Sequence, residues 1–446
     1  MRRLRSTILL VLLFAGIGAY AYFVTSKKPA PDAPPTKDRV FKGVDADAIT
    51  NLTVKADAGD TTTLKKENGV WKMVAPLQTD GDSDDLMQIT SNLSTLEINR
   101  TVEDNPTDLN QYHLQTPRIE IDFTAGKDMH RLYIGEKTPT NGDLFARRDD
   151  DKKVYLIGGF TEAIFNRTTF DLRDKKLVSV DPEKVGGMTL DSDGKTVQMT
   201  KTGEDWALAK PISLPGDNGN IDMFLSRVKT VAMKSMVAEQ GSPADLKKDG
   251  FDKPQGSITL DAGDKHQTLV VGGKMDDSSL YIRDAAKPWI ATVDASFLKE
   301  LQKGTDDFRR RALFEFKGFD ADRLELTKDG QTYVFERVKS QGQAPDKWHR
   351  TAPTAGDPDA AKMETLLAKL ENLRALDFVP STTKTGLDKP TLAVSAKYQD
   401  GKKEEHVSFA KGDDIVYASR MGEPGIAKVA TAEFDDTVKA LDGVAK

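Results

Sequence analysis

The stretch Phe41-Lys42-Gly43-Val44-Asp45-Ala46-Asp47 returns almost unchanged as Phe316-Lys317-Gly318-Phe319-Asp320-Ala321-Asp322. The two copies are 275 residues apart, which corresponds to two periods of about 137 residues. A middle copy is then expected near residue 178, where Val178-Ser179-Val180-Asp181-Pro182 gives a weak match. Self-similarity at a fixed spacing is the signature of a repeat architecture, so this stretch decides the fold.

Other markers recur at the same spacing. A Trp is followed five residues later by a Pro at three places: Trp71 and Pro76, Trp206 and Pro211, Trp348 and Pro353. Fifteen residues after each Trp begins an apolar stripe with the spacing i, i+3, i+7, which predicts an amphipathic helix. The stripes are Leu86/Ile89/Leu93, Ile221/Phe224/Val228 and Met363/Leu366/Leu370. Copies one and two also end alike, at residues 172–177 and 308–313.

Each copy has the pattern of an α+β module. Alternating apolar residues on both sides of turns such as Asn68-Gly69 predict antiparallel hairpins, and the Trp lies on the second strand of the first hairpin. An aspartate precedes each helical stripe and is the expected N-cap: Asp82 or Asp84, Asp217, and Asp357 with Pro358 as the first helical residue. We therefore predict one sheet covered by one helix, three times in tandem.

The N-terminus predicts a membrane anchor. Residues 7–24 run without a charge and span about 27 Å as a helix, close to the bilayer hydrocarbon thickness. Three arginines precede this segment and two lysines follow it, which favours an N-terminus in the cytoplasm and the rest of the chain outside. The alternative is a signal peptide cleaved after Ala19-Tyr20-Ala21. Both interpretations export the chain.

The resulting division has five parts: a cytoplasmic tip and transmembrane anchor (1–28), a Pro-rich linker (29–38) and three repeat modules (39–176, 177–312 and 313–446). The expected location is the inner (cytoplasmic) membrane, single-pass, with the bulk of the chain in the periplasm. The fold class is α+β, with three tandem copies of an antiparallel-sheet-plus-helix module after an N-terminal transmembrane helix.

Composition narrows the class of partner. The 446 residues carry a net charge of −6, and residues 1–28 hold five cations and no acid, so the remainder carries −11. Nucleic-acid binding rests on clustered cations, so a nucleic-acid partner is not expected. The chain has no cysteine, which excludes disulfides, thiolate nucleophiles and sulfur-ligated zinc.

Motifs that could carry chemistry are incomplete. The five histidines show no spacing of i, i+2 or i, i+4, so no metal or catalytic cluster is expected: His113, His130, His266, His349, His406. Residues 80–85 begin like a calcium loop, but Asp85 stands where a glycine is needed and Ser91 where a bidentate glutamate is needed. Helix capping explains these aspartates better.

Two further fragments resemble parts of known enzymes. Gly194-Lys195-Thr196 ends like a phosphate loop, but Thr189 replaces the required glycine and the context predicts a hairpin turn. Ser-x-x-Lys occurs at Ser226/Lys229 and Ser296/Lys299, with Lys384-Thr385-Gly386 further on, but the Ser-Asp-Asn element of penicillin-recognising enzymes is missing between them. We predict no enzymatic activity, no catalytic residue, no cofactor and no metal ion.

The three tryptophans at equivalent strand positions have two interpretations. They could be platforms on which sugar rings stack, or they could pack in the core beside the hairpin. Their repetition at one structural address favours the core.

Several of these motifs together resemble the bacterial family called domain of unknown function 4340. They are the anchor, the hairpin ending in Trp-x4-Pro, the helix after an aspartate, the turn at Leu387–Pro390 with its counterparts at Phe251–Pro254 and Leu114–Pro117, and the closure at residues 172–175. The resemblance implies a repeat-containing, membrane-anchored envelope protein, often encoded beside ABC-transporter permeases and gliding-motility auxiliary components. It supplies no catalytic residues.

The sequence thus favours a non-enzymatic periplasmic scaffold or accessory protein, associated with an ABC-type transport or gliding-motility-like envelope complex. The expected partners are an inner-membrane protein complex, including ABC permease components, and the membrane itself through the N-terminal helix. The alternative is a binding module for cell-wall glycan or another envelope polymer.

Overall fold

The computed structural model describes residues 38–140, 142–340 and 346–445. The chain divides into two compact units, residues 1–175 and 176–446. The predicted anchor at residues 7–24 lies outside the described part, and among the described residues no helix is long and apolar enough to span a bilayer. The division into five parts stays a prediction.

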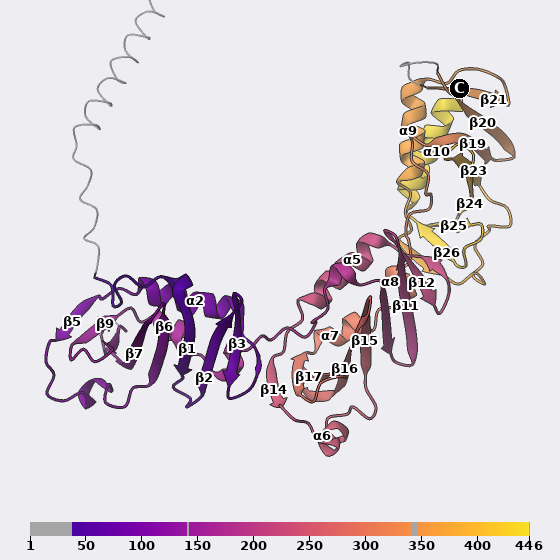
Figure 1. Ribbon diagram of the computed structural model, residues 1–446. Coiled ribbons are helices and arrows are strands. Elements are labelled where there is room, and N and C mark those ends of the chain that lie inside the picture. Colours follow the sequence, from indigo (N-terminus) through magenta and orange to yellow (C-terminus); the bar gives the residue numbers. More distant parts are fainter. Residues whose placement is uncertain (1–37, 141, 341–345, 446) are drawn as a thin grey trace, which may run out of the picture. The chain divides into compact units, whose positions relative to one another are not determined.

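The first unit contains one antiparallel sheet of nine strands, in the order β4-β3-β2-β1-β6-β7-β8-β9-β5 (Figure 1). A 3-10 turn, η1 (Ala46–Ala48), leads into it, and η2 (Asn110–Tyr112) precedes β6. The strands are β1 (Ile49–Lys55), β2 (Thr61–Glu67), β3 (Val70–Ala75), β4 (Thr79–Asp80), β5 (Arg100–Glu103), β6 (Ile119–Ala125), β7 (Asp128–Lys137), β8 (Leu144–Arg148) and β9 (Val154–Ile157).

The second unit contains two further antiparallel sheets. The nine-stranded one follows η3 (Pro182–Lys184) and has the order β13-β12-β11-β10-β15-β16-β17-β18-β14. Its strands are β10 (Gly187–Ser192), β11 (Lys195–Thr202), β12 (Asp205–Lys210), β13 (Leu214–Pro215), β14 (Ser235–Ala238), β15 (Gly256–Ala262), β16 (Lys265–Asp276), β17 (Ser279–Asp284) and β18 (Ile290–Asp294).

The other sheet of the second unit has eight strands in the order β21-β20-β19-β23-β24-β25-β26-β22. They are β19 (Ala321–Lys328), β20 (Gln331–Val338), β21 (Lys347–Ala352), β22 (Asp377–Val379), β23 (Leu392–Tyr398), β24 (Lys403–Lys411), β25 (Val416–Arg420) and β26 (Ile426–Val429). In all three sheets the first long strand, β1, β10 or β19, pairs with the next strand and also with β6, β15 or β23, the second strand after the long helix.

The predicted helices form over the apolar stripes. They are α2 (Ser83–Thr95), α5 (Asn218–Lys229) and α9 (Ala360–Glu371), and each buries its whole stripe. Asp82 and Asp217 are their N-caps as predicted, but the third N-cap is Asp359 and not Asp357. Asp357 is used elsewhere, because its carboxylate lies 2.6 Å from Nδ1 of His349.

One covering helix per sheet was too few. After the last long strand of each sheet come further helices: α3 (Thr161–Phe165) and α4 (Thr169–Leu172), α7 (Ser296–Leu301) and α8 (Thr305–Phe308), and α10 (Thr431–Ala445). A short helix, α6 (Pro243–Lys248), also follows β14. All of these except α10 have six residues or fewer, which is too short for an apolar period to be read from the sequence. In Figure 1, α10 lies beside α9 over the third sheet.

The predicted turns are present. Asn68 and Gly69 join β2 to β3 with φ of 51° and 82°, and Asp193 and Gly194 join β10 to β11 with φ of 52° and 72°. Such left-handed pairs match the twist of a hairpin. The prolines of all three Trp-x4-Pro motifs follow cis peptide bonds. Apolar side chains on the helix-covered faces form the cores, one cluster drawing on residues 40–172 and another on residues 313–444.

Replacing Trp206 tests how much one hairpin Trp contributes to this core. Its side chain is 2% exposed and its Nε1 donates a hydrogen bond of 3.0 Å to Asp222 of α5. Trp206→Ala should lower the free energy of unfolding of the second unit by about 3–5 kcal/mol. Denaturant unfolding followed by circular dichroism measures this. Met223→Ala on the same helix is the control, since that side chain is 52% exposed and its loss should cost less than about 0.5 kcal/mol. A loss below about 1 kcal/mol for Trp206→Ala would mean that the ring is not a core residue.

Candidate functional site

The structure does not bring the histidines together. His130, His266, His349 and His406 lie on β7, β16, β21 and β24, and His113 follows η2. Three of them pair with neighbouring side chains at 2.6 Å: His266 with Asp261, His349 with Asp357, and His406 with Ser395. Within the described residues no group of three or more potential ligands could hold a metal ion.

Among the aspartates of residues 80–85, Asp82 caps helix α2. The Asp82 carboxylate accepts hydrogen bonds of 3.1 Å from the amides of Asp84 and Asp85. Lys175 lies 3.0 Å from Asp82, and Arg167 lies 3.0 Å from Asp85. Burial opposes ionisation of Asp82, but these amide bonds and the charge of Lys175 outweigh it and lower its pKa. The carboxylates of Asp82 and Asp85 therefore bond to groups of the protein itself.

The enzyme-like fragments are structural elements. Asp193-Gly194 forms the hairpin turn described above, and Lys195 begins β11. The Ser226 hydroxyl donates to the carbonyl oxygen of Asp222 within α5, and Ser296 begins α7. Lys384-Thr385-Gly386 lies in the loop between β22 and β23. These segments belong to separate elements of the second unit.

The tryptophans pack in the interior as the sequence favours. Trp71 is 7% exposed and Trp206 is 2% exposed, while Trp348 is half-buried against the core of the third sheet. A cation from the neighbouring strand lies over each ring: Lys66 at 6.0 Å from the centroid of Trp71, Lys201 at 5.7 Å from Trp206, and Arg337 at 5.1 Å from Trp348.

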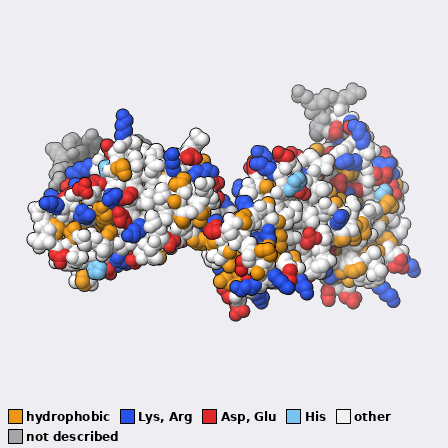
Figure 2. Space-filling view, turned by 60° about the horizontal axis from the view of Figure 1, so that its bottom comes forward, with side chains coloured by type: hydrophobic (Ala, Val, Ile, Leu, Met, Phe, Trp, Pro, Cys, Tyr) orange, Lys and Arg blue, Asp and Glu red, His pale blue; other side chains and the backbone are white. Residues whose placement is uncertain are grey.

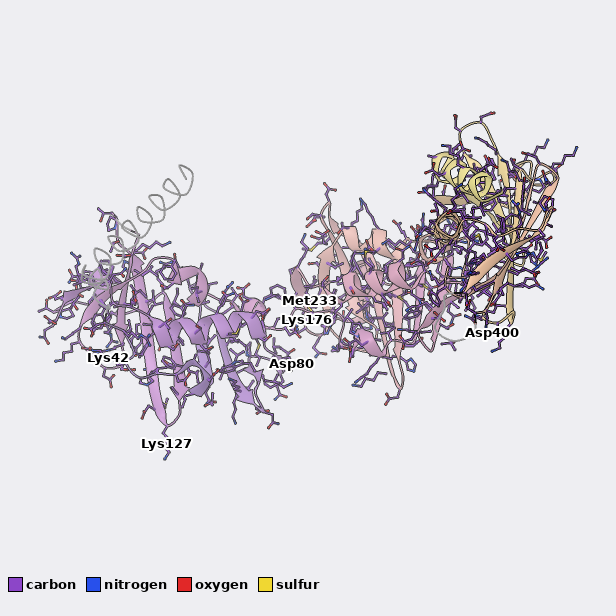
Figure 3. The ribbon with its side chains drawn as sticks, turned by 90° about the horizontal axis from the view of Figure 1, so that it is seen from above. Lys42, Asp80, Lys127, Lys176, Met233 and Asp400 are labelled. Atoms are coloured by element: carbon purple, nitrogen blue, oxygen red, sulfur yellow. The ribbon has the colours of Figure 1, made fainter. Side chains whose placement is uncertain are left out.

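Gln267, Asp284 and Glu405 are buried polar residues that lie where the chain enters the second and third sheets. We call residues 38–41, 176–180 and 312–316 the entry segments. Each makes one antiparallel bridge to the chain that leaves the long helix: Arg39 with Glu97, Lys176 with Ala232, and Ala312 with Arg374. Lys176 and Met233, next to Ala232, lie side by side in Figure 3.

The third entry segment is held by a cluster of charges. Glu405 on β24 is 4% exposed and accepts hydrogen bonds from the amides of Glu315 (3.0 Å) and Phe316 (3.0 Å). Arg420 on β25 donates to Glu405 at 2.9 Å and to Glu315 at 3.1 Å. Arg310 pairs with Glu315 and Glu423, and the Tyr398 hydroxyl donates to Glu315 at 3.1 Å. We call Arg310, Glu315, Tyr398, Glu405, Arg420 and Glu423 the junction cluster.

The titration of the junction cluster follows from burial and pairing. Burial raises the pKa of Glu405, although its two amide donors oppose the shift. Burial also opposes ionisation of Glu315, but the hydrogen bond and charge of Arg310 outweigh it and lower its pKa. Burial and the charge of Glu315 raise the pKa of Tyr398. The pKa values of Glu315 and Glu405 within this cluster are thus shifted in opposite directions.

The second sheet uses neutral chemistry at the same place. Gln267 occupies on β16 the position of Glu405 on β24, and its Oε1 accepts from the amide of Ser179 at 2.8 Å. Its Nε2 donates to the carbonyl of Leu177 at 2.8 Å and to Asp284 at 2.9 Å. Asp284 stands where Arg420 stands in the third sheet, since both lie across from equivalent strand residues.

The first sheet uses an arginine and aromatic rings. Arg148 on β8, at the position of Asp284 and Arg420, donates to the carbonyl of Val40. His130 replaces Gln267 and Glu405, and its ring packs 5.3 Å from Phe41 and 5.1 Å from Phe123. In each sheet a side chain at one of these two strand positions therefore bonds to the main chain of the entry segment: Arg148 in the first, Gln267 in the second and Glu405 in the third.

These groups hold segments of the chain in place. In the junction cluster the carboxylates, the guanidinium groups and the Tyr398 hydroxyl bond to one another and to the main chain. A hollow of about 860 Å³ lies beside the cluster, lined by Arg310, Glu315 and Arg374 together with Trp206 and Asp217. Sequence reasoning missed these positions because His130, Gln267 and Glu405 share no residue type. Their common place, two residues before the apolar alternation of the strand begins, was the available signal.

Exchanging Gln267 and Glu405 gives opposite pH dependences. Glu405→Gln should lower the free energy of unfolding at pH 7 by about 1–3 kcal/mol, since the new NH₂ faces Arg420. A carboxyl with a raised pKa stabilises the native state most below its ordinary pKa, and that contribution is lost as pH rises through the raised value. The advantage of the native sequence over Glu405→Gln should therefore grow as pH falls toward about 4.5.

Gln267→Glu is the matched variant. It places a carboxylate against Asp284 and the carbonyl of Leu177, so it should cost about 3 kcal/mol or more at pH 7. Protonation relieves this repulsion, so the advantage of the native sequence should shrink on acidification. Urea unfolding at several pH values measures both variants. Equal slopes for the two would contradict the assignment of these positions.

Comparisons with known proteins give a family. Residues 71–212 and 206–390 match the family model described as "Domain of unknown function (DUF4340)". No curated protein matches the chain. One solved structure, a DNA polymerase sliding clamp from Pseudomonas aeruginosa with ligand, aligns with 89% of this chain and 93% of its own at 8% identity and a TM-score of 0.15, and nothing about fold or function follows from so low a score. The two matched segments together cover most of the chain, which therefore belongs to the DUF4340 family.

Proposed function

We propose that this chain is a non-enzymatic, membrane-anchored periplasmic scaffold built from three tandem copies of one module. The single observation that carries the proposal is that a side chain at one of two equivalent strand positions bonds to the main chain of the entry segment in all three sheets: Arg148, Gln267 and Glu405. The shared strand order of the three sheets supports the tandem arrangement. The sequence supports the anchor, through residues 7–24 and their flanking cations.

The partner in this proposal is a protein complex of the inner membrane, of the ABC-permease type. A chain whose part after residue 28 carries −11 is repelled by anionic lipid headgroups, so it docks on protein. In Figure 2 the cations and carboxylates are interspersed over the visible face, with apolar side chains between them. A surface on which both charges are mixed in this way is better suited to specific contacts with a protein than to binding a polyanion.

The alternative ligand is cell-wall glycan. The main argument for it, stacking of sugar rings on the three hairpin tryptophans, is weakened by the structure. Stacking on sugars needs exposed aromatic faces, and Trp71 and Trp206 are buried. The two functions separate in a pull-down. Retention on washed peptidoglycan at physiological salt favours the polymer, whereas recovery of permease subunits after mild crosslinking favours the scaffold.

The topology of the scaffold has a direct test. A reporter that is active only in the periplasm should work when fused after Asp38, and the mature protein should retain residues 1–20, because the apolar run continues past the cleavage-like site to Val24. N-terminal sequencing of the membrane fraction measures this. A mature chain beginning at Tyr22 would exclude the anchor and leave export intact.

Site-specific crosslinking tests which part meets the membrane partner. The Pro-rich linker gives about 30 Å of reach, enough to meet the external loops of a permease but not to cross the periplasm. Crosslinkers placed in residues 39–176 should therefore capture inner-membrane proteins more often than crosslinkers in residues 313–446, as scored by mass spectrometry. Equal capture from both ends would contradict this arrangement.

A further inference from the structure

Two of the three sheets have one edge covered by the end of their own module. In the first, the amide of Asp82 donates to the carbonyl of Leu172 at 2.9 Å, and the amide of Asp174 donates to the carbonyl of Asp80 at 2.8 Å. These two bonds make an antiparallel bridge between Gly81 and Arg173. Figure 3 labels Asp80 at this edge. We call residues 172–174 a closing segment.

The second sheet repeats the arrangement. Its closing segment is residues 308–310: the amide of Asp217 donates to the carbonyl of Phe308 at 2.8 Å, and the amide of Arg310 donates to the carbonyl of Pro215 at 2.9 Å. The bridge joins Gly216 to Arg309. In both sheets the closing segment has an apolar residue followed by an arginine, and it covers the main chain just before the N-cap of the long helix.

The third sheet presents the same edge without such a cover among the described residues. The positions equivalent to Asp80 and Asp82, two residues before the N-cap and the N-cap itself, are Asp357 and Asp359. Counted along the chain from the end of β9, Leu172 and Arg173 correspond to Val444 and Ala445 after the end of β26. Both of these residues belong to helix α10. Asp357 and Asp359 are exposed.

The chemistry of this open edge still permits an outer bridge. Gly81 and Gly216 donate their own amides inward, to the carbonyls of Trp71 and Trp206. The equivalent residue in the third sheet is Pro358, which has no amide hydrogen. The outer bridge does not need it, because in the covered sheets the outer bonds come from the flanking residues. The carbonyl of Asp357 and the amide of Asp359 are the corresponding groups.

The surroundings of the open edge select the side chains of an occupant. A hollow of about 790 Å³ begins at Asp357 and Pro358 and continues along α9. Its walls include Trp348 and Phe319, and the Phe319 side chain is 80% exposed. Its charged lining residues are four carboxylates and two cations: Asp346, Asp357, Glu364, Glu371, Arg337 and Lys347. Carboxylates beside apolar rings suit a segment that carries both a cation and an apolar side chain.

We propose that the edge at residues 357–359 binds an extended segment of a partner protein that carries an apolar residue next to an arginine. A partner carbonyl accepts from the amide of Asp359, and a partner amide donates to the carbonyl of Asp357, as the closing segments do in the other two sheets. Strand addition at an unpaired edge is a common mode of peptide recognition. This inference deepens the proposed scaffold role, but its test needs neither a membrane nor a permease.

The probe for the test is a fluorescent peptide with the sequence of residues 305–313, Thr-Asp-Asp-Phe-Arg-Arg-Arg-Ala-Leu, titrated with the full chain in mild detergent. Fluorescence anisotropy should show saturable binding. Asp357→Lys should weaken it at least tenfold, because the change reverses a charge at the edge. Asp80→Lys is the matched control, since that position lies at an edge that is already covered, and it should change the affinity less than twofold.

A second peptide tests the main-chain bond. Methylation of the amide nitrogen at the residue corresponding to Arg310 removes the donor for the Asp357 carbonyl and should weaken binding at least tenfold. Circular dichroism checks that each variant is folded. Lack of saturable binding up to about 1 mM would overturn the proposal. Unchanged affinity of the methylated peptide would overturn edge pairing in favour of charge alone, and dispersal of a self-associated chain by Asp357→Lys would identify a second copy as the occupant.

Discussion

The structure depends on how each sheet satisfies the main chain that enters it. The entry segments are partly buried. A buried amide or carbonyl without a hydrogen-bond partner destabilises the folded state by an amount that is large compared with the net free energy of folding. The three sheets solve this from the same two strand positions with different groups. Arg148 donates to a carbonyl, Gln267 serves both a carbonyl and an amide, and Glu405 accepts from two amides. We call Arg148, Gln267 and Glu405 the clamps of the three entry segments. Each clamp donates where it faces a backbone carbonyl and accepts where it faces a backbone amide.

Within the second unit the connection between the two sheets is only a few residues long. Arg309 still bridges to Gly216 at the edge of one sheet, and Ala312 already bridges to Arg374 at the end of a helix of the next. The Arg309 guanidinium lies 3.8 Å from the ring of Phe378 and donates to the carbonyl of Pro424 at 2.9 Å. A connection in which successive residues bond to different sheets has few free dihedral angles, so it behaves as structure and not as a flexible linker.

Periodic features of the fold could be predicted from the sequence, and features without a period could not. The helical stripes, the hairpin tryptophans and the left-handed turn at Asn68-Gly69 follow from spacing and propensity. The sequence predicts Asp357 as the third N-cap, whereas the structure has Asp359 there. Two aspartates flank Pro358, and the sequence does not show that one of them, Asp357, pairs with His349. The sequence alone does not reveal the clamps, because the equivalent positions on the three sheets carry three different residue types: His130, Gln267 and Glu405. Their equivalence lies in register, which only the paired strands reveal.

The proposed scaffold has two kinds of surface for recognition, exposed side chains and unpaired strand edges. Side chains of mixed charge give specificity but little affinity in water. An edge offers main-chain donors and acceptors in a fixed direction, and it recognises backbone before it recognises sequence. In the described residues the closing segments cover this edge in the first two sheets, by bonds to Asp80 and Pro215. In the proposed complex, the carbonyl of Asp357 and the amide of Asp359 fix the direction and register of the bound segment. The partner needs only to supply an extended strand.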